Sequence, residues 1–369
     1  MKILVTGGAG FIGSHIVDGL IEKNYEVIIL DNLEIQVHHG KKPDYLNKDA
    51  KFVKGDVKNQ KDWFRAIKNV DIVIHLAASV GINQSMYKPS YYLYNNVIGT
   101  SNLYEILLKK KSIRKKIKKI IIPSSKTIYG EGTYICKKCG IVYPELRTSE
   151  QLEKKDWEVH CPKCGKYVKP IGTKEDKPAN PLSTYAISKY DVERMAINYG
   201  FALNIPTFIF RGFSIFGPRQ SLSNPYSGVC SIFLNRLKNK KPPIIFEDGK
   251  QLRDYIFIED VKEALLKALE SEIQGIYNLG TGKPISVNEI ANYLIEILDS
   301  KIEPIITGEY RVGDNRHDFA DITKLKKDLK FKPKWNIKKG LEALVEWGEK
   351  QKSKDFFDKS EKIRKSIFK

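Results

Sequence analysis

The chain has 369 residues, enough for two domains or for one large domain with an appendage. Hydrophobic residues make up 41% and charged residues 29%, which excludes a disordered or collagen-like chain. No 18 consecutive residues are apolar, and the first residues, MKILVTGG, do not form a secretory signal. We therefore expect a globular cytoplasmic protein that neither spans nor binds a membrane.

The charge is strongly positive, with 63 Lys and Arg against 44 Asp and Glu, or +19. Such a surface attracts nucleic acid, anionic lipid or a phosphorylated small molecule. Most of the excess is scattered Lys, and the one dense block, residues 109–119 (KKKSIRKKIKK), follows a helical pattern. We interpret this block as a solvated helix end, and we expect no nucleic-acid partner. A basic nucleic-acid-binding protein remains the alternative from another class.

The first half of the chain alternates strands with helices. Residues 2–6 (KILVT) predict a strand, and a glycine-rich turn then leads into a helix with apolar residues at positions 12, 16 and 20. Further strands are predicted at residues 26–30, 52–53, 71–76, 119–122 and 206–210. This alternation predicts an α/β fold, a Rossmann doubly wound parallel sheet covered on both faces, in a domain of residues 1–211.

The second half is organised differently. Residues 131–170 contain CKKCG and CPKCG with neither helical nor strand periodicity, which indicates an insertion. A helix is predicted at residues 181–199. Beyond it, helical patterns at 228–237, 259–269 and 286–298 alternate with short strands near 244 and 276. They predict a smaller mixed α/β lobe at residues 212–352 that binds substrate, with elements able to cross back to the first sheet. The charged tail, residues 353–369, predicts a loosely held helix.

The glycine turn after the first strand predicts a dinucleotide site. Gly7, Gly10 and Gly13 let a pyrophosphate approach backbone N–H groups at a helix N-terminus. Asp31 ends the second strand, where it can accept hydrogen bonds from both adenosine ribose hydroxyls and would repel a 2′-phosphate. The expected cofactor is therefore NAD rather than NADP. Asp56, after the third strand, can accept from the adenine amino group.

A Tyr and a Lys four residues apart in the predicted helix indicate the chemistry. Tyr185 and Lys189 share one helix face. A neighbouring ammonium and the positive nicotinamide ring both favour the phenolate, which can then remove a proton from an alcohol as its carbon gives up hydride. Ser125 follows the fifth strand, at the edge where ligands bind in such sheets, and can share its hydroxyl with the same oxygen. Thr127 is a further candidate for positioning the substrate.

Four of the five cysteines form two CxxC pairs, Cys136 with Cys139 and Cys161 with Cys164, separated by 21 residues. Each pair precedes a glycine that lets backbone approach sulfur. Four thiolates make a closed tetrahedral site without an open position for catalysis. We therefore predict a structural zinc ribbon, whose metal folds a segment with little apolar content of its own.

These residues resemble those of the extended short-chain dehydrogenase/reductase family, specifically its NAD-dependent nucleotide-sugar epimerases and dehydratases. The resemblance covers nearly the whole chain. It rests on TGGAGFIG (6–13), GDV (55–57), HLAA (75–78), NNVIGT (95–100), SSKTIYG (124–130), YAISK (185–189), RGFSIFGPRQ (211–220), RDYIFIEDV (253–261), NLGTG (278–282) and RVGDNRHDFAD (311–321).

The resemblance implies a bound NAD, with Tyr185 as base, Lys189 on the nicotinamide ribose and Ser125 between Tyr and sugar. The implied cofactor contacts are Gly7, Gly10, Phe11, Ile12, Gly13, Asp31, Asn32, Asp56, Val57, Leu76, Ala77, Ala78, Asn96, Tyr185 and Lys189. The implied substrate contacts are Ser125, Lys126, Thr127, Arg253, Arg311 and Asp314. Arg offers a planar fork for the diphosphate, and a carboxylate suits ribose hydroxyls. The resemblance also implies a homodimer formed through helices of the NAD domain.

The residues after Ser125 favour an epimerase. Dehydratases of this family resemble one another in carrying an Asp-Glu pair there, whereas this chain has Lys126 and Thr127. What remains is removal and return of hydride at one carbon, which inverts C4 of a nucleoside-diphosphate hexose through a 4-keto intermediate. A 4,6-dehydratase or a reductase of the same family remains the alternative.

The substrate and the role of the insertion stay open. VGINQSMY (80–87), SNPYSGV (223–229) and the cysteine-bearing insertion resemble the dTDP-L-rhamnose 4-epimerase branch, while UDP-glucose/galactose and UDP-glucuronate epimerisation are further alternatives. The insertion stretches the distance from Ser125 to Tyr185 to 60 positions, so it must loop out and return. Our hypothesis is that it forms a knob over or beside the sugar pocket, or an oligomer contact.

Overall fold

The computed structural model describes residues 1–311 and 313–367. Its centre is a seven-stranded sheet in the order β13-β9-β5-β4-β1-β2-β3, and every pair of neighbouring strands is parallel. The strands are β1 (Lys2–Thr6), β2 (Glu26–Asp31), β3 (Lys51–Lys54), β4 (Ile72–His75), β5 (Lys119–Ser125), β9 (Thr207–Gly212) and β13 (Gly275–Leu279). The predicted Rossmann-like parallel sheet is confirmed.

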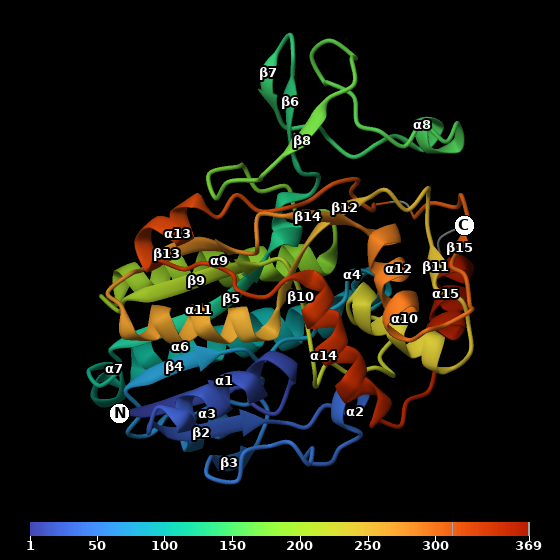
Figure 1. The fold of residues 1–369 in the computed structure, drawn as a ribbon. Coiled ribbons are helices and arrows are strands. Elements are labelled where there is room, and N and C mark those ends of the chain that lie inside the picture. Colours follow the sequence, from blue (N-terminus) through green and yellow to red (C-terminus); the bar gives the residue numbers. More distant parts are fainter. Residues whose placement is uncertain (312, 368–369) are drawn as a thin grey trace.

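Helices cover both faces of this sheet (Figure 1). Alternate residues of β1 point to opposite cores, Ile3 and Val5 to one and Leu4 to the other. The first core includes α1 (Phe11–Glu22) and α11 (Ile258–Glu270), and the second includes α3 (Gln60–Ile67), α6 (Gly99–Lys109) and α9 (Thr184–Ala202). Two buried faces explain why the strands are continuous apolar runs rather than alternating ones.

The second lobe is smaller and mixed. It holds β10 (Ser214–Phe216), β12 (Leu252–Phe257) and β14 (Pro284–Ser286) in one sheet, and β11 (Ile244–Ile245) pairs with β15 (Ile305–Ile306). Helices α10 (Val229–Lys238), α12 (Val287–Ile297) and α14 (Ile337–Glu349) pack against one another beside these strands. Strand β13 lies within this stretch of the sequence but pairs at the edge of the large sheet. The two parts of the chain therefore share one core.

Short helices connect these elements. They are α2 (Ile35–His38), α4 (Ile82–Tyr87), α5 (Pro89–Tyr92), the π-helix η1 (Leu93–Ile98), α7 (Lys111–Arg114), the 3₁₀ turn η2 (Lys126–Tyr129) and α13 (Thr323–Leu329). Among the described residues, no helix is both long and apolar enough to cross a bilayer.

The cysteine-bearing insertion stands out from the body at the top of Figure 1. Strands β6 (Thr133–Cys136), β7 (Gly140–Val142) and β8 (Lys169–Ile171) form an antiparallel sheet in the order β7-β6-β8, and α8 (Ser149–Glu153) follows β7. Its own small core consists of Tyr134, Val142, Val159 and Val168 around the cysteines.

The C-terminal tail differs from its prediction. Helix α15 (Phe357–Ile367) buries Phe357 and Ser360, and the buried Arg236 of α10 pairs with Asp355 at 3.2 Å and with Asp358 at 2.8 Å. A loosely held helix was therefore the wrong expectation. Its partners lie more than 100 positions away in sequence, so a local charge pattern does not reveal them.

Candidate active site and cysteine cluster

The glycine turn joins β1 to α1 at the carboxyl end of the sheet. Gly7 has φ +68°, and a Cβ on Gly13 would lie 2.1 Å from the carbonyl oxygen of Gly7, so both positions require glycine. Gly10 is the N-cap of α1 and offers no side-chain partner to its first turn. The N–H groups of that turn, which include those of Phe11, Ile12 and Gly13, are therefore suited to a pyrophosphate.

Asp31 lies at the end of β2, directly beside this turn. Its Oδ2 accepts the N–H of Ala9 at 3.0 Å, and its Oδ1 accepts the N–H of Leu33 at 2.8 Å. Each oxygen keeps a lone pair for a ribose hydroxyl. Asn32 donates from Nδ2 to Oδ2 of Asp56 at 3.1 Å, which ties the ends of β2 and β3 together. Val57 is buried directly after Asp56.

The end of β4 packs closely on the glycine turn. Leu76, Ala77 and Ala78 follow the strand, and the N–H of Ala77 donates to Oγ1 of Thr6 at 3.2 Å. Asn96 of η1 is buried with its polar atoms in use. Its Nδ2 donates to Ser79 O at 3.1 Å and to Ser188 Oγ at 2.9 Å, and its Oδ1 accepts from Ser79 N at 2.7 Å. Both amide protons bind protein, so Asn96 connects β4 to α9, and its influence on a cofactor would be indirect.

Ser125, Tyr185 and Lys189 converge although 60 positions separate the first two. Ser125 ends β5, and Tyr185 begins α9, where the N-cap Ser183 accepts the N–H of Ala186 at 3.1 Å. The Ser125 hydroxyl lies close enough to Tyr185 to favour its phenolate. All three side chains are buried. Thr127 donates from Oγ1 to Ser125 Oγ at 2.9 Å, so it orients the serine hydroxyl.

Burial controls the ionisation of this trio. It raises the pKa of Tyr185 to about 12, although the nearby Ser125 hydroxyl acts in the opposite direction. Burial also lowers the pKa of Lys189 to about 8. The Glu193 carboxylate acts in the opposite direction and raises this pKa, but its effect is smaller. In the chain by itself, desolvation of the phenol outweighs any effect of the lysine. Ionisation of Tyr185 near neutral pH thus requires a further positive charge, such as an oxidised nicotinamide.

The cations expected to bind substrate have partners within the protein. Lys126 pairs with Asp318 at 2.5 Å. Arg253 donates from Nη1 to the carbonyl oxygens of Leu252 and Arg316, both at 2.8 Å, and from Nη2 to that of Asn315 at 2.9 Å. Arg253 therefore holds the backbone of the neighbouring segment, so a contact with diphosphate would have to share these donors.

Arg311 and Asp314 lie just before residues 316–320, which contact both β12 and the roots of the insertion. Arg311 pairs with Glu361 of α15 at 2.6 Å, and its guanidinium lies 3.9 Å from the ring centre of Phe246. Its buried Nε has no hydrogen-bond partner among the described residues. Burial raises the pKa of Asp314. This Nε belongs to the stacked guanidinium, so Arg311 keeps a donor that an anion could use.

Sequence reasoning missed three groups near this site. Asp318 binds Lys126, Glu361 binds Arg311, and the hydroxyls of Tyr87 and Tyr226 bind each other. Both tyrosines stand in segments singled out for their resemblance to one branch of the family. Glu361 had no such signal, because it lies in a charged tail without a motif.

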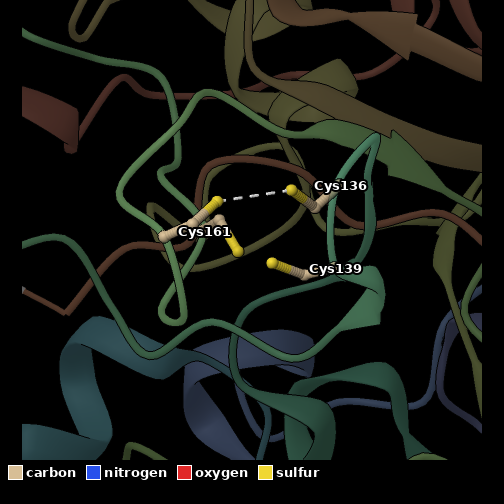
Figure 2. A group of neighbouring side chains, drawn as sticks. Cys136, Cys139 and Cys161 are labelled. Atoms are coloured by element: carbon tan, nitrogen blue, oxygen red, sulfur yellow. Dashed lines mark hydrogen bonds between the residues drawn. The ribbon is translucent and has the colours of Figure 1, made fainter.

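The four cysteines of the two CxxC pairs converge. Cys136 and Cys139 come from the β6–β7 turn and the other two from residues 161–164, and the four sulfurs lie within 4.8 Å of one another. Figure 2 shows the side chains of Cys136, Cys139 and Cys161 pointing toward a common centre. Backbone N–H groups of Cys139 and Lys138 lower the pKa of Cys136 to about 7, which favours the thiolate that metals bind.

Comparisons with known proteins agree with this geometry. The sequence profile described as "NAD dependent epimerase/dehydratase family" matches residues 3–151 and 162–280, and the gap between the two stretches falls in the insertion. The chain belongs to this family. It is similar to the dTDP-L-rhamnose 4-epimerase of Burkholderia thailandensis, with 32% identity over 351 residues that cover 94% of each chain.

Two further relatives carry related descriptions. A putative UDP-glucose 4-epimerase of Methanocaldococcus jannaschii is 36% identical over 348 residues, which cover 94% of this chain and 97% of the relative. The crystal structure of a UDP-glucose 4-epimerase from Thermotoga maritima with UDP-glucose superposes with a TM-score of 0.77 at 32% identity, covering 95% of this chain and 99% of that one. The chain therefore has the fold of nucleotide-sugar epimerases over almost its whole length.

Proposed function

We propose that the protein is an NAD-dependent nucleotide-sugar 4-epimerase, an isomerase that inverts C4 of a nucleoside-diphosphate hexose through a 4-keto intermediate. The observation that carries the proposal is the proximity of two buried side chains, Ser125 and Tyr185, at the same sheet edge as the glycine turn, with the buried Lys189 one helical turn further along α9. A dTDP-L-rhamnose-like sugar and UDP-glucose/galactose are the substrates that its relatives suggest.

The residues present fit NAD. The first turn of α1 suits the pyrophosphate, Asp31 suits the adenosine ribose, and Lys189 suits the nicotinamide ribose. When bound, NAD supplies a hydride acceptor and a positive charge. Tyr185 takes the proton of the C4 hydroxyl as hydride leaves C4, while Ser125 holds the same oxygen. The keto sugar then rotates in the site. Tyr185 returns the proton as hydride is added to the opposite face of the sugar. No net oxidation results.

A dehydratase lacks support at the position where it needs an acid and a base. Lys126 is paired with Asp318, and the hydroxyl of Thr127 donates to Ser125. Neither residue has a carboxyl group, so this position lacks the acid that would protonate a leaving hydroxyl. A reductase shares all of the residues above, so only the fate of NADH distinguishes it from an epimerase.

The proposal is tested with purified protein, bound NAD and a panel of dTDP-L-rhamnose, UDP-glucose, UDP-galactose and UDP-glucuronate. NMR should show inversion at C4 for at least one sugar without net change in NADH. Tyr185→Phe should lower kcat by about 10²–10⁴-fold, because the general base is lost. Tyr199→Phe, on the same helix but stacked on Tyr104 at 4.8 Å, is the control and should retain activity. Full turnover by Tyr185→Phe would contradict the mechanism, and net NADH consumption would indicate a reductase.

We also propose that the four-cysteine cluster holds one structural zinc ion. Four convergent sulfurs on two CxxCG turns fit a closed tetrahedral site, and the insertion has few other apolar contacts to hold it. Elemental analysis should find about one zinc per chain. Cys161→Ser should lose the zinc and the order of residues 133–171, whereas Cys230→Ala should keep both, because Cys230 lies in the main core. A chain that neither contains nor takes up zinc would contradict this proposal.

A homodimer and a cytoplasmic location complete the proposal. Large apolar side chains are exposed on η1 and α9, which pack together: Leu93, Tyr94, Ile98 and Ile187. An exposed apolar patch of this kind favours a protein partner, here a second copy of the chain. None of the five cysteines forms a disulfide, which suits a reducing compartment. No nucleic-acid partner is proposed.

A further inference from the structure

Both roots of the insertion contact one segment of the substrate lobe, residues 316–321. At its root, Glu131 accepts the N–H of Arg316 at 2.7 Å and that of His317 at 3.1 Å. A Cβ on Gly132 would lie 2.3 Å from the carbonyl oxygen of His317, so the backbones touch here. At the other root, Thr173 forms a β-bridge with Ala320. Residues 313–321 are thus held between the two ends of the insertion.

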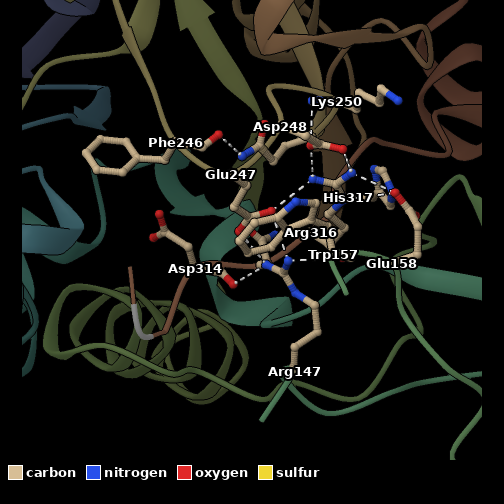
Figure 3. Close-up of polar contacts among 12 residues, drawn as sticks. Arg147, Trp157, Glu158, Phe246, Glu247, Asp248, Lys250, Asp314, Arg316 and His317 are labelled. Carbon is tan, nitrogen blue, oxygen red and sulfur yellow. Dashed lines mark hydrogen bonds and ion pairs between the residues drawn. The ribbon is translucent and has the colours of Figure 1, made fainter. Parts of the chain in front are cut away.

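An ion cluster around the buried Arg147, Glu247 and Arg316 extends this attachment toward the surface, where Glu158 is 45% exposed (Figure 3). Arg147 of the insertion binds both carboxylate oxygens of Glu247, at 2.8 and 2.9 Å. Arg316, which is fully buried, binds Glu247 at 2.9 Å, Asp248 at 2.7 Å and Glu158 of the insertion at 2.6 Å. Two guanidiniums thereby face three carboxylates. The insertion and the substrate lobe each contribute one arginine and at least one carboxylate.

The cluster reaches the predicted substrate residues directly. Arg147 donates from Nη2 to the carbonyl oxygen of Asp314 at 3.2 Å. His317 accepts the N–H of Leu252 at Nδ1, so its Nε2 carries the proton and donates to Glu158 at 3.1 Å. Asp314 is therefore fixed from one side by an arginine of the insertion, and the neighbouring His317 by a glutamate of the insertion.

The cysteine cluster in turn fixes both insertion residues. Arg147 donates to the carbonyl oxygen of Trp157 at 3.0 Å, next to Glu158. The following residue, Val159, is buried against the cysteines, and Cys161 is two positions further on. Without metal, the four sulfurs would lose their common ligand, and the loop that carries Glu158 would lose its anchor. The buried Arg316 would then lack part of its counter-charge.

We propose that Arg147 and Glu158 are positioning residues for substrate binding, which link the cysteine-bound metal to the affinity of the site for a nucleoside diphosphate. They hold residues 314–317, and with them Asp314 and the adjacent Arg311, in the conformation that binds this half of the substrate. They do not contact Ser125, Tyr185 or Lys189 and leave the chemical step unaffected. This inference rests on the proposed function, from which the nucleoside diphosphate follows.

The test uses the full chain with NAD and zinc bound, and the probes are UDP and dTDP in calorimetric titrations. Arg147→Gln removes the fork to Glu247 and should weaken binding of the preferred nucleotide by about tenfold or more, since small displacements of binding groups have large effects. Glu158→Gln should weaken it less, and Arg147→Lys should recover part of the loss. The matched control is Glu153→Gln, an exposed acid on α8 of the same insertion, which should bind like the wild type.

Two measurements distinguish a positioning role from a general loss of folding. NAD occupancy should be unchanged in every variant, and with a turned-over sugar KM should rise while kcat stays near the wild-type value. Zinc removal should weaken nucleotide binding in the wild type and add little in Arg147→Gln, because both act through the same contact.

The outcomes are distinct. Wild-type binding of UDP or dTDP with unchanged affinity in Arg147→Gln and Glu158→Gln overturns the inference and leaves the epimerase proposal intact. Wild-type protein that binds neither nucleotide overturns both. Loss of NAD together with nucleotide in both variants shows general unfolding and also overturns the positioning role.

Discussion

Tyr185 shows how a buried site sets the reactivity of a single residue. Desolvation disfavours the phenolate and raises the pKa of Tyr185 to about 12, and the same burial lowers the pKa of Lys189 to about 8. Above about pH 8 the lysine loses its proton and with it the positive charge that would favour the phenolate. The free site thus keeps Tyr185 protonated, and the base forms only when a cation is added.

This predicts that NAD lowers the pKa of Tyr185. Ultraviolet difference spectra near 295 nm, taken between the wild type and Tyr185→Phe, isolate this one phenol among the 19 tyrosines. The pKa without cofactor should be about 12, and added NAD⁺ should lower it, whereas NADH, without the ring charge, should lower it less. An identical titration with and without NAD⁺ would contradict the dependence on cofactor charge.

The residues of the site were predictable to different extents. The positions of Gly13 and Asp31 at the carboxyl end of the sheet were predictable, because the β1-α1-β2 unit fixes where each must lie, and that of Ser125 followed from its place at the end of a buried strand. Arg253 was not predictable, since a motif gives the residue but not its three backbone carbonyl partners.

Helix α15 shows what a single buried cation does for an element. Arg236 is 4% exposed and pairs with the equally buried Asp355 and with Asp358. Lys241 is 41% exposed and pairs with the same two acids from the surface. Breaking a buried pair leaves one charge without its partner, whereas a surface pair contributes little. The attachment of the tail therefore depends mainly on Arg236.

We expect Arg236→Ala to lower the free energy of unfolding by about 3 kcal/mol or to release α15 locally. Limited trypsin digestion should then cut at the lysines of the tail first. Lys241→Ala is the matched control, with an expected change of about 0–1 kcal/mol. Equal protease sensitivity of both variants would show that α15 is held by other contacts, such as that of Glu361.

At the level of elements, the sequence predicted the central sheet well and the second lobe less well. Strands such as β1, β2 and β4 are buried on both faces, so they appear as continuous apolar runs between helices. Strands β14 and β15 have three and two residues and take their conformation from partners distant in sequence. Short, exposed pairs of this kind leave no periodicity to recognise.

At the scale of the whole molecule, two groups of exposed apolar side chains among the described residues are candidates for self-association. One is the apolar patch on η1 and α9, and the other is the insertion, where Ile135, Ile141 and Tyr143 are exposed. The first lies on the six-residue η1 and the 19-residue α9, which pack against each other. The second stands away from the body and is narrow (Figure 1).

We predict a dimer through the first surface. Light scattering coupled to gel filtration should give twice the chain mass for the wild type and the chain mass for Ile98→Glu, because a charge in an apolar interface is left without a partner. Ile141→Ser, on the insertion, should remain a dimer. The reverse result, with Ile141→Ser monomeric and Ile98→Glu dimeric, would make the insertion the oligomer contact.

Full burial of Arg316 has a consequence for engineering a smaller enzyme. Excising residues 134–168 and closing the gap with a tight turn would also remove Glu158, and Arg147 would no longer shield Glu247. The trimmed protein would then enclose a guanidinium and a carboxylate with fewer neighbours than either needs. A workable deletion must replace Arg316 and Glu247 together, so the appendage cannot be removed as a module and the active-site scaffold left as it was.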